Sequence, residues 1–276
     1  MSEALAVSIP APRTEHDAVI RAAIAPIVAA LAGAAELDAI SFERFNKPDW
    51  GVRLRVLGSR EWLAGVARHE VERQLSAAGR SFTFVEAAAE DKWIGGRDDE
   101  DRLKAIDHAD TTACLALMEA EAEGLLSTSR AQWSLLAVEA MLDLFGLAGD
   151  DRLAFYRRGW EWAPDAGRWD DEVFEALEDK YEAQRVSLRV ALSAPTTEAW
   201  GGPMPERIAT TLLSSVREPI VAIRTGAAGR TPKSAMDLAL LVGHAHSNRL
   251  GIHATQEATI RYLVWRARGG RRPSTS

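Results

Sequence analysis

The distribution of strand-like and helix-like periodicity along the 276 residues constrains the fold more than any other feature. Apolar and polar residues alternate in the first third of the chain only, at 39–45, 52–57 and 81–86. The turn residues at 46–51 predict that the first two of these strands pair as a hairpin. Helical spacing of apolar residues surrounds the hairpin, at 18–33 with a kink at Pro26 and at 60–78.

The remaining two thirds of the chain shows almost continuous helical spacing. The predicted helices cover 99–122, 130–146, 150–160, 170–192, 205–224, 233–248 and 255–268. Strands gathered at one end and helices thereafter favour an α+β fold over alternating βαβ units. We therefore predict a small antiparallel sheet in the N-terminal third, covered by a predominantly helical layer. Residues 1–268 are predicted to form a single domain, and residues 269–276, which lack apolar side chains, a disordered tail.

Composition and charge exclude several classes of protein. A hydrophobic content of 47% is ample for a packed core, and a net charge of −7 argues against direct binding of nucleic acid. No basic, apolar leader and no run of eighteen apolar residues is present, so we expect no membrane association and a cytoplasmic location. The single cysteine, Cys114, lies in an apolar run and is predicted to be a buried, inert thiol.

Two arginines in the second predicted strand are the first candidates for chemistry. Arg53 and Arg55 are two residues apart, so their side chains point to the same face of the sheet. Guanidinium groups match the two oxygens of a carboxylate, which makes the pair a candidate anion site. The alternative is that both arginines simply lie on the solvated face of a half-buried strand.

A polar segment at the end of a predicted helix provides the second candidate group. His244 and Asn248 are four residues apart on one face of that helix, and His246 diverges from His244 by about 200° around it. Because histidine titrates near neutrality, His244 is suited to proton transfer. The alternative is a helix-end histidine bonded to backbone carbonyls. The two histidines diverge around the helix and lack an evident third ligand, so we predict no metal.

Tryptophan is frequent, with nine in the chain. Those at helical spacing among leucines are predicted to belong to the core, namely Trp62, Trp133 and Trp265. Others fall in predicted loops or near helix ends, where they could line a peptide groove, namely Trp93, Trp160, Trp162, Trp169 and Trp200. Motifs of serine hydrolases, P-loop proteins and dinucleotide-binding enzymes are missing from the sequence, and we expect no cofactor.

In order and spacing, four segments resemble the thiopeptide-type bacteriocin biosynthesis domain family. These segments are Phe42 to Arg55, Ala109-Asp110 with Leu115 onward, Asp151 to Arg157, and His244 to Leu250 followed by Glu257. The family is similar to the C-terminal elimination domain of lantibiotic dehydratases and to thiopeptide pyridine synthases. The resemblance extends over roughly residues 18–268.

The resemblance implies a lyase that acts on a ribosomally made peptide. Such a domain takes a leader-bearing precursor whose Ser or Thr carries glutamate, removes the α-proton and expels glutamate, which leaves dehydroalanine or dehydrobutyrine. The resemblance assigns catalytic roles to Arg53 and Arg55, which hold carboxylates, and to His244, which moves protons. The further residues expected to bind substrate are Arg44, His246, Asn248, Arg249 and Trp93.

Departures from the family pattern leave alternatives open. Gly51 stands where the family often has histidine, and the arginine expected after the third strand is not evident in residues 85–93. The alternative enzyme is a pyridine synthase, a [4+2] macrocyclase that joins two dehydroalanines with loss of water and leader. A non-catalytic module that binds the precursor peptide is a third reading.

The chain also lacks a glutamylating region. We therefore expect a separate glutamyl-tRNA-dependent protein to supply the activated peptide, as in a split dehydratase. The oligomeric state stays open, with a homodimer as one option.

Overall fold

A computed structural model of the protein describes residues 3–46, 49–85, 97–162, 169–193, 196–226 and 235–271. The chain divides into two compact units. The first comprises Met1–Ala122 with Ser214–Pro232, and the second comprises Glu123–Leu213 with Lys233–Ser276.

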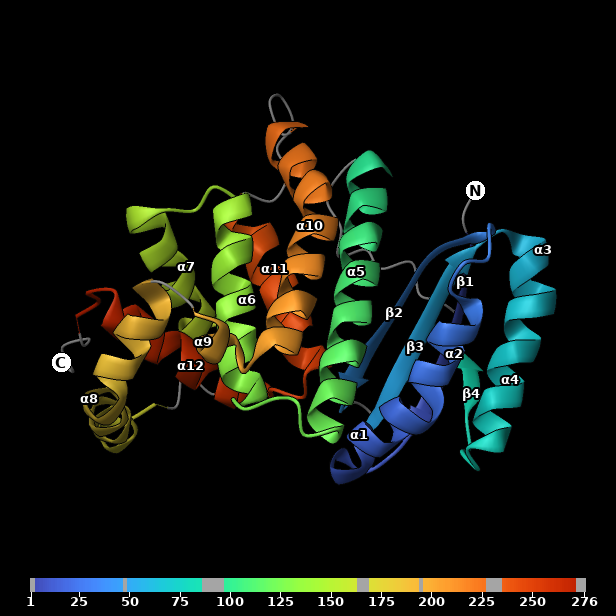
Figure 1. Cartoon of the computed structure of the whole chain (residues 1–276), viewed down its shortest axis with the longest axis horizontal. Coiled ribbons are helices and arrows are strands. Elements are labelled where there is room, and N and C mark those ends of the chain that lie inside the picture. The colour runs from blue at the N-terminus through green and yellow to red at the C-terminus, as the bar shows by residue number, and fades with distance from the viewer. Residues whose placement is uncertain are drawn as a thin grey trace. The chain divides into compact units, whose positions relative to one another are not determined.

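A four-stranded antiparallel sheet forms the centre of the first unit (Figure 1). Its strands are β1 (Glu3–Pro10), β2 (Leu37–Phe45), β3 (Gly51–Gly58) and β4 (Thr83–Val85), in the order β2-β3-β1-β4. β2 and β3 form the predicted hairpin, with Phe45 opposite Gly51 at its closed end. Apolar side chains alternate with polar ones along most of β2 and β3, and the buried side chains of the sheet include Val7, Ile9, Ile40, Phe42 and Leu54.

Helices of the first unit pack against this buried face. The first helical segment consists of α1 (His16–Val19), a π-helical turn and α2 (Ala25–Leu31). The second consists of α3 (Arg60–Trp62), another π-helical turn and α4 (Arg68–Ala77). In the first segment the π-helical turn, Ile20–Ile24, ends just before Pro26, at the predicted kink.

The outer edge of the sheet at β2 is occupied by α5 (Arg97–Ala122). Nδ1 of His108 on this helix accepts a hydrogen bond of 3.1 Å from the backbone N–H of Ile40. An edge strand exposes unpaired backbone donors that attract other strands. His108 therefore satisfies one of these donors with a side chain from the neighbouring helix.

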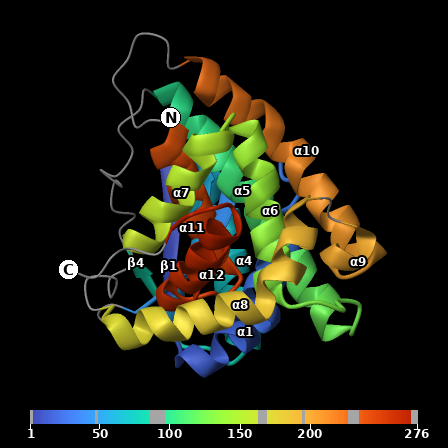
Figure 2. The same ribbon diagram turned by 90° about the vertical axis from the view of Figure 1, so that its left-hand side faces the viewer.

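The second unit is entirely helical in its described residues. It contains α6 (Arg130–Leu144), α7 (Gly149–Glu161), α8 (Asp171–Ser193), α9 (Thr197–Trp200), α11 (Ala235–Arg249) and α12 (Ala254–Ala267). The long helix α10 (Pro203–Gly226) begins in this unit and continues in the first. α12 packs against α7 and α8 (Figure 2), and its Tyr262 contacts Trp160 of α7 and Phe174 of α8.

The predicted α+β class is confirmed, as is the helical nature of the C-terminal two thirds. β1 was not predicted, although it lies between β3 and β4 and pairs with both. Its sequence, Glu-Ala-Leu-Ala-Val-Ser-Ile-Pro, shows little contrast between its two faces, because the apolar Ala4 and Ala6 lie between the larger apolar residues Leu5 and Val7 of the other face. The predicted single domain over 1–268 stays a prediction, and most of the predicted tail, at 272–276, lies outside the described residues.

Within the part of the chain that the structure describes, no helix has the length and apolar character needed to cross a membrane. The predicted core tryptophans Trp62, Trp133 and Trp265 are all buried. Trp160 and Trp200, which were candidates for a groove, are buried as well.

Candidate functional site

Arg53 and Arg55 share the polar face of the sheet, as the alternation predicted. Arg53 lies opposite Ser8 on β1 and Glu43 on β2, and Arg55 lies opposite Ala6 and Ser41. Directly opposite residues in an antiparallel sheet point to the same face. The two guanidinium groups therefore stand among side chains that are mostly short, which leaves them the longest groups in the middle of this face.

The Arg53 guanidinium is oriented by two neighbours on β2. Its Nη1 donates to Oε1 of Glu43 at 2.8 Å, and its Cζ lies 5.0 Å from the centre of the Phe45 ring. Both members of the ion pair are more than a third exposed. Exposed pairs of this kind contribute only about 0–1 kcal/mol, so an incoming carboxylate can compete with Glu43 for Arg53 at little cost.

Packing at the closed end of the hairpin explains why residue 51 is glycine. A Cβ atom at Gly51 would lie 2.7 Å from the carbonyl oxygen of Ile9 and would meet the ring of Phe45. The phenyl ring thus fills the space that a side chain at position 51 would need. The histidine that the family often carries there does not fit this backbone and ring arrangement.

Arg44, a predicted substrate-binding residue, lies on the opposite face of the sheet from Arg53 and Arg55. It is paired with the buried Val52 across the hairpin. Its guanidinium lies 2.7 Å from Oδ1 of Asp17, and the Arg44 side chain is 10% exposed. The structure does not bring Arg44 together with the arginine pair, and its role in substrate binding stays a prediction.

In the second unit, His244 is held by a carboxylate from the next helix. Its Nδ1 lies 2.7 Å from Oε2 of Glu257. The turn between α11 and α12 makes this contact: Gly251 adopts a φ of +79° and the N–H of Ile252 donates back to the carbonyl of Ser247. Glycine tolerates this left-handed conformation, which reverses the chain sharply after a helix. The reversal brings the last turn of α11 beside the first turn of α12.

Glu257 is itself held by Arg261, one turn further along α12. Arg261 donates from Nη2 to Oε1 of Glu257, so the two carboxylate oxygens have different partners. Both charged side chains are buried. Burial by itself would raise the pKa of Glu257, but the hydrogen bond with His244 and the charge of Arg261 outweigh it and lower the pKa below its ordinary value. Glu257 is therefore an anion at neutral pH.

Gly159 on α7 makes room for the buried guanidinium. A Cβ at Gly159 would collide with Nη1 and Cδ of Arg261, whereas one at Gly243 on α11 would lie 3.5 Å from Nη2, at ordinary van der Waals distance. The Phe155 ring is 5.0 Å from Cζ of Arg261, within the range of a cation–π contact. Gly159 and this ring form a glycine slot that fixes Arg261, and through it Glu257.

Of the three linked side chains His244, Glu257 and Arg261, His244 is the one that reaches solvent to a substantial degree. The side chain of His244 is 37% exposed, whereas that of Glu257 is 9% exposed. A cavity of about 20 Å³ borders Glu257 and Arg261, and its polar lining also includes Ser134, Tyr156 and Ser247. It has room for about one water molecule and none for a peptide. Within the part of the chain that the structure describes, His244 is therefore the member of this group that a substrate can contact.

The hydrogen bond determines what His244 can do. An ionised carboxylate only accepts hydrogen bonds, so Nδ1 must carry the proton in the contact with Glu257. In the neutral ring the lone pair then resides on Nε2. The arrangement provides a base at Nε2 with a fixed ring orientation, as in other histidines oriented by a buried carboxylate.

Of the other predicted residues on α11, Asn248 shares the face of His244 and the others do not. Asn248 lies one turn beyond His244 and is half-buried like it, whereas His246 and Arg249 are buried. The His246 ring packs against Trp133, with 5.6 Å between the ring centres. The roles of these three residues in substrate binding stay predictions. Trp93 lies outside the described residues, as does most of the segment that was searched for a further arginine.

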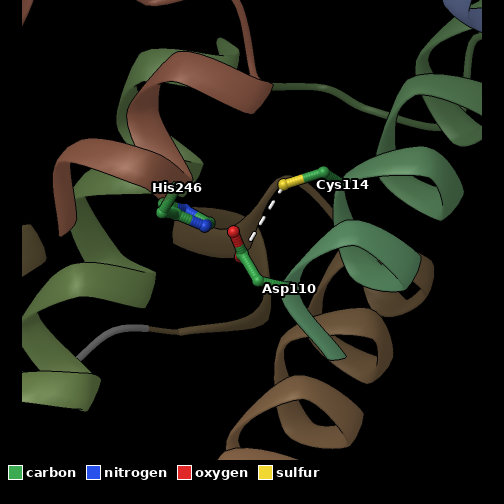
Figure 3. Close-up of side chains that lie close together, drawn as sticks. All are labelled: Asp110, Cys114 and His246. Carbon is green, nitrogen blue, oxygen red and sulfur yellow. Dashed lines mark hydrogen bonds between the residues drawn. The ribbon is translucent and has the colours of Figure 1, made fainter. Parts of the chain in front are cut away.

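Cys114 is fully buried on α5, as predicted. Figure 3 shows its sulfur directed at Asp110, one turn earlier on the same helix, with 3.7 Å between Sγ and Oδ1. A thiol shielded from solvent in this way is not available as a nucleophile for a substrate.

The sequence pattern of the family includes Glu257, but no role was predicted for this residue. Arg261 was not predicted as a functional residue. One signal was available, because an acidic and a basic residue four apart on a helix indicate an ion pair. That spacing usually marks a solvated surface pair. Only the burial of both side chains sets this pair apart.

A family model described as lantibiotic biosynthesis dehydratase C-term matches residues 5–268. Among solved structures, the tRNA-dependent lantibiotic dehydratase MibB from Microbispora sp. 107891 superposes with a TM-score of 0.72 at 18% identity. The match covers 96% of this chain and 28% of the MibB chain, so this chain spans less than a third of that protein.

Two further solved structures are similar in size to this chain. The pyridine synthase TbtD from thiomuracin biosynthesis has a TM-score of 0.69 at 17% identity, with 96% of this chain and 97% of TbtD covered. TsrL has a TM-score of 0.63 at 17% identity, with coverages of 97% and 94%. No curated protein matches the sequence. At these identities the similarity to solved structures establishes the fold.

Proposed function

The chain belongs to the lantibiotic biosynthesis dehydratase C-terminal family, and on this premise we propose that it matures a ribosomally made peptide by eliminating glutamate from glutamylated Ser or Thr. The products are dehydroalanine from serine and dehydrobutyrine from threonine. The reaction class is that of a lyase, which acts on a peptide activated elsewhere.

The proposed reaction assigns a separate task to each group. Nε2 of His244 removes the α-proton, the electron pair of that bond forms the Cα=Cβ double bond, and the Cβ–O bond breaks. Glutamate leaves with the bonding electrons as a carboxylate. Arg53 and Arg55 hold glutamate carboxylates and stabilise the leaving group, because fixed cations favour a transition state in which negative charge develops.

The observation that carries this proposal is the contact between His244 and Glu257. A histidine whose Nδ1–H is bound by a buried anion, and whose side chain is 37% exposed, is arranged for proton abstraction. The arginine pair on the polar face of the sheet supports the choice of an anionic leaving group. Glutamate, unlike water, carries carboxylates that two guanidinium groups can bind.

The proposed partners follow from the proposed reaction. The substrate is a precursor peptide with a leader segment. A separate protein that uses glutamyl-tRNA would attach glutamate to this peptide, so the present chain would be one component of a split dehydratase. The structural relative MibB is a tRNA-dependent dehydratase, in keeping with such a source of glutamate for the family.

Formation of a pyridine ring by [4+2] cycloaddition of two dehydroalanines is the second candidate function. It is favoured by the match to TbtD, which covers 97% of that protein, compared with 28% of MibB. The departure at Gly51 from the family pattern, now explained by the Phe45 ring, also fits a relative whose chemistry has changed.

The test uses purified protein and two synthetic peptides analysed by mass spectrometry. A glutamylated precursor is expected to lose its glutamyl mass and release an equal amount of free glutamate. An untouched adduct, together with cyclisation of a peptide that contains two dehydroalanines and release of its leader, would instead identify a pyridine synthase. If the protein binds the leader tightly but alters neither peptide, the non-catalytic alternative holds.

A further inference from the structure

One described tryptophan is exposed far more than the others. Trp162 follows α7 directly and is 68% exposed, whereas Trp50, the next most exposed, is at 43%. A single exposed apolar side chain is common on the surface of a folded protein. Exposure alone says nothing about a binding partner. The contacts of the Trp162 ring are therefore needed to assign it a role in binding.

Trp162 contacts the residue that the proposed function uses for proton transfer. The centres of the Trp162 and His244 rings are 5.7 Å apart and the rings are nearly perpendicular, at 86°. This is an edge-to-face contact, the geometry that aromatic pairs prefer. A peptide whose α-proton reaches Nε2 of His244 therefore has its neighbouring residues within reach of the indole.

The backbone that carries the indole is held by the last turn of α7. The N–H of Trp162 donates to the carbonyl of Arg158 at 3.0 Å, and Nη2 of Arg158 lies 2.6 Å from Oδ1 of Asp237 on α11. The end of α7 is thus tied to the helix that carries His244. A side chain whose backbone is held in this way loses less conformational entropy on binding a ligand than a side chain on a flexible segment.

We propose that Trp162 is a specificity-determining residue whose indole face binds a flat, uncharged ring on the peptide residue next to the one being modified. This inference rests on the proposed function, because it takes His244 as the base. A cationic side chain is disfavoured on the same indole, since His244 becomes positively charged when it accepts a proton. A flat neutral ring meets no such repulsion and gains the stacking energy of an aromatic pair.

The experiment compares three glutamylated peptides that differ only in the residue after the modified serine, which is Phe, Ala or Lys. With the unaltered protein, KM for the Phe peptide is expected to be about three- to tenfold lower than for the Ala and Lys peptides, with a similar kcat. Trp162→Leu keeps an apolar side chain without a flat ring and should abolish this difference, whereas Trp162→Phe should retain most of it.

A matched control is Trp50→Ala, which removes another exposed tryptophan and should leave the preference intact. The inference is overturned if the unaltered protein shows no preference, or if Trp162→Leu retains it. Equilibrium binding of the unmodified Phe and Ala peptides, followed by fluorescence polarisation, separates this inference from the proposed reaction. If no peptide releases glutamate, the proposed reaction fails, and loss of the binding preference in Trp162→Leu still decides the role of Trp162.

Discussion

Nδ1 of His244 and Oε2 of Glu257 are 2.7 Å apart, although the two residues belong to successive helices. The contact leaves one ring nitrogen of His244 for substrate and fixes its protonation through the other. Arg261 and its glycine slot keep the carboxylate in place. Orientation of a base by buried groups is a recurrent requirement of acid–base catalysis, because small displacements of the base slow proton transfer strongly.

Replacement of Glu257 tests the protonation of His244. In Glu257→Gln the side-chain amide can donate to Nδ1, which would place the ring proton on Nε2 and remove the base. Glutamate release is expected to slow by about 10²- to 10⁴-fold in kcat, with a much smaller change in KM. Rapid-quench assays of glutamate release measure this effect. His244→Ala with added imidazole serves as the comparison: imidazole should restore part of its activity but none of the activity of Glu257→Gln.

The arginine pair is tested by binding of the glutamylated peptide. Arg53→Gln and Arg55→Gln each remove a charged donor, and KM for the glutamylated peptide is expected to rise by about 10- to 100-fold. Glu43→Gln is the matched control, because it removes the carboxylate that occupies Arg53 and should lower KM by up to about fivefold. Equal KM values in all three variants would exclude a carboxylate site on this face of the sheet.

The burial of His108 leads to a prediction of how the stability of the first unit depends on pH. Burial lowers the pKa of His108 from its ordinary value of 6.5, and its contact with the N–H of Ile40 requires an unprotonated Nδ1. Because the folded state resists protonation more than the unfolded state, this contribution to stability is fully present above about pH 6.5. It is lost as the pH falls through the lowered pKa of the folded state.

Urea unfolding of the protein at about pH 7.5 and about pH 5.5 measures this loss. His108→Gln can still accept the hydrogen bond from Ile40 without titrating, so its free energy of unfolding should decrease less between the two pH values. His16, whose pKa burial also lowers, contributes with the same sign in both proteins. A variant with the same decrease as the unaltered protein would show that His108 is not responsible.

Replacement of Gly159 tests whether the slot around Arg261 holds this side chain in place. A methyl group in Gly159→Ala collides with the guanidinium, so either α7 or Arg261 must move, at an expected cost of about 1–3 kcal/mol in the free energy of unfolding. The displaced Arg261 should also reduce kcat through Glu257. Gly65→Ala is the control, since no atom lies within 4 Å of the added Cβ there. Circular dichroism melts of both variants should show a lower Tm for Gly159→Ala only.

The sequence alone was sufficient for features that depend on neighbouring residues. The alternation at 39–57 predicted the hairpin and the shared face of Arg53 and Arg55, because a strand turns successive side chains to opposite faces. Helical spacing predicted most helices for the same local reason. β1 was not predicted because its stability comes from pairing with β3 and β4 on either side, and because Ala4 and Ala6 reduce the contrast between an apolar and a polar face.

The family pattern identified His244 and included Glu257, but only the tertiary structure decided how they work. The position of Arg44 on the other face of the sheet follows from the register across the hairpin, with Arg44 opposite Val52. The contact of His244 with Glu257 depends on the reversal at Gly251, and the burial of Arg261 on packing between α7, α11 and α12. The periodicity of the sequence indicates on which side of a helix or strand a residue lies. The partner of a side chain depends instead on which elements pack together, because hydrogen bonds and burial involve residues that are distant in sequence.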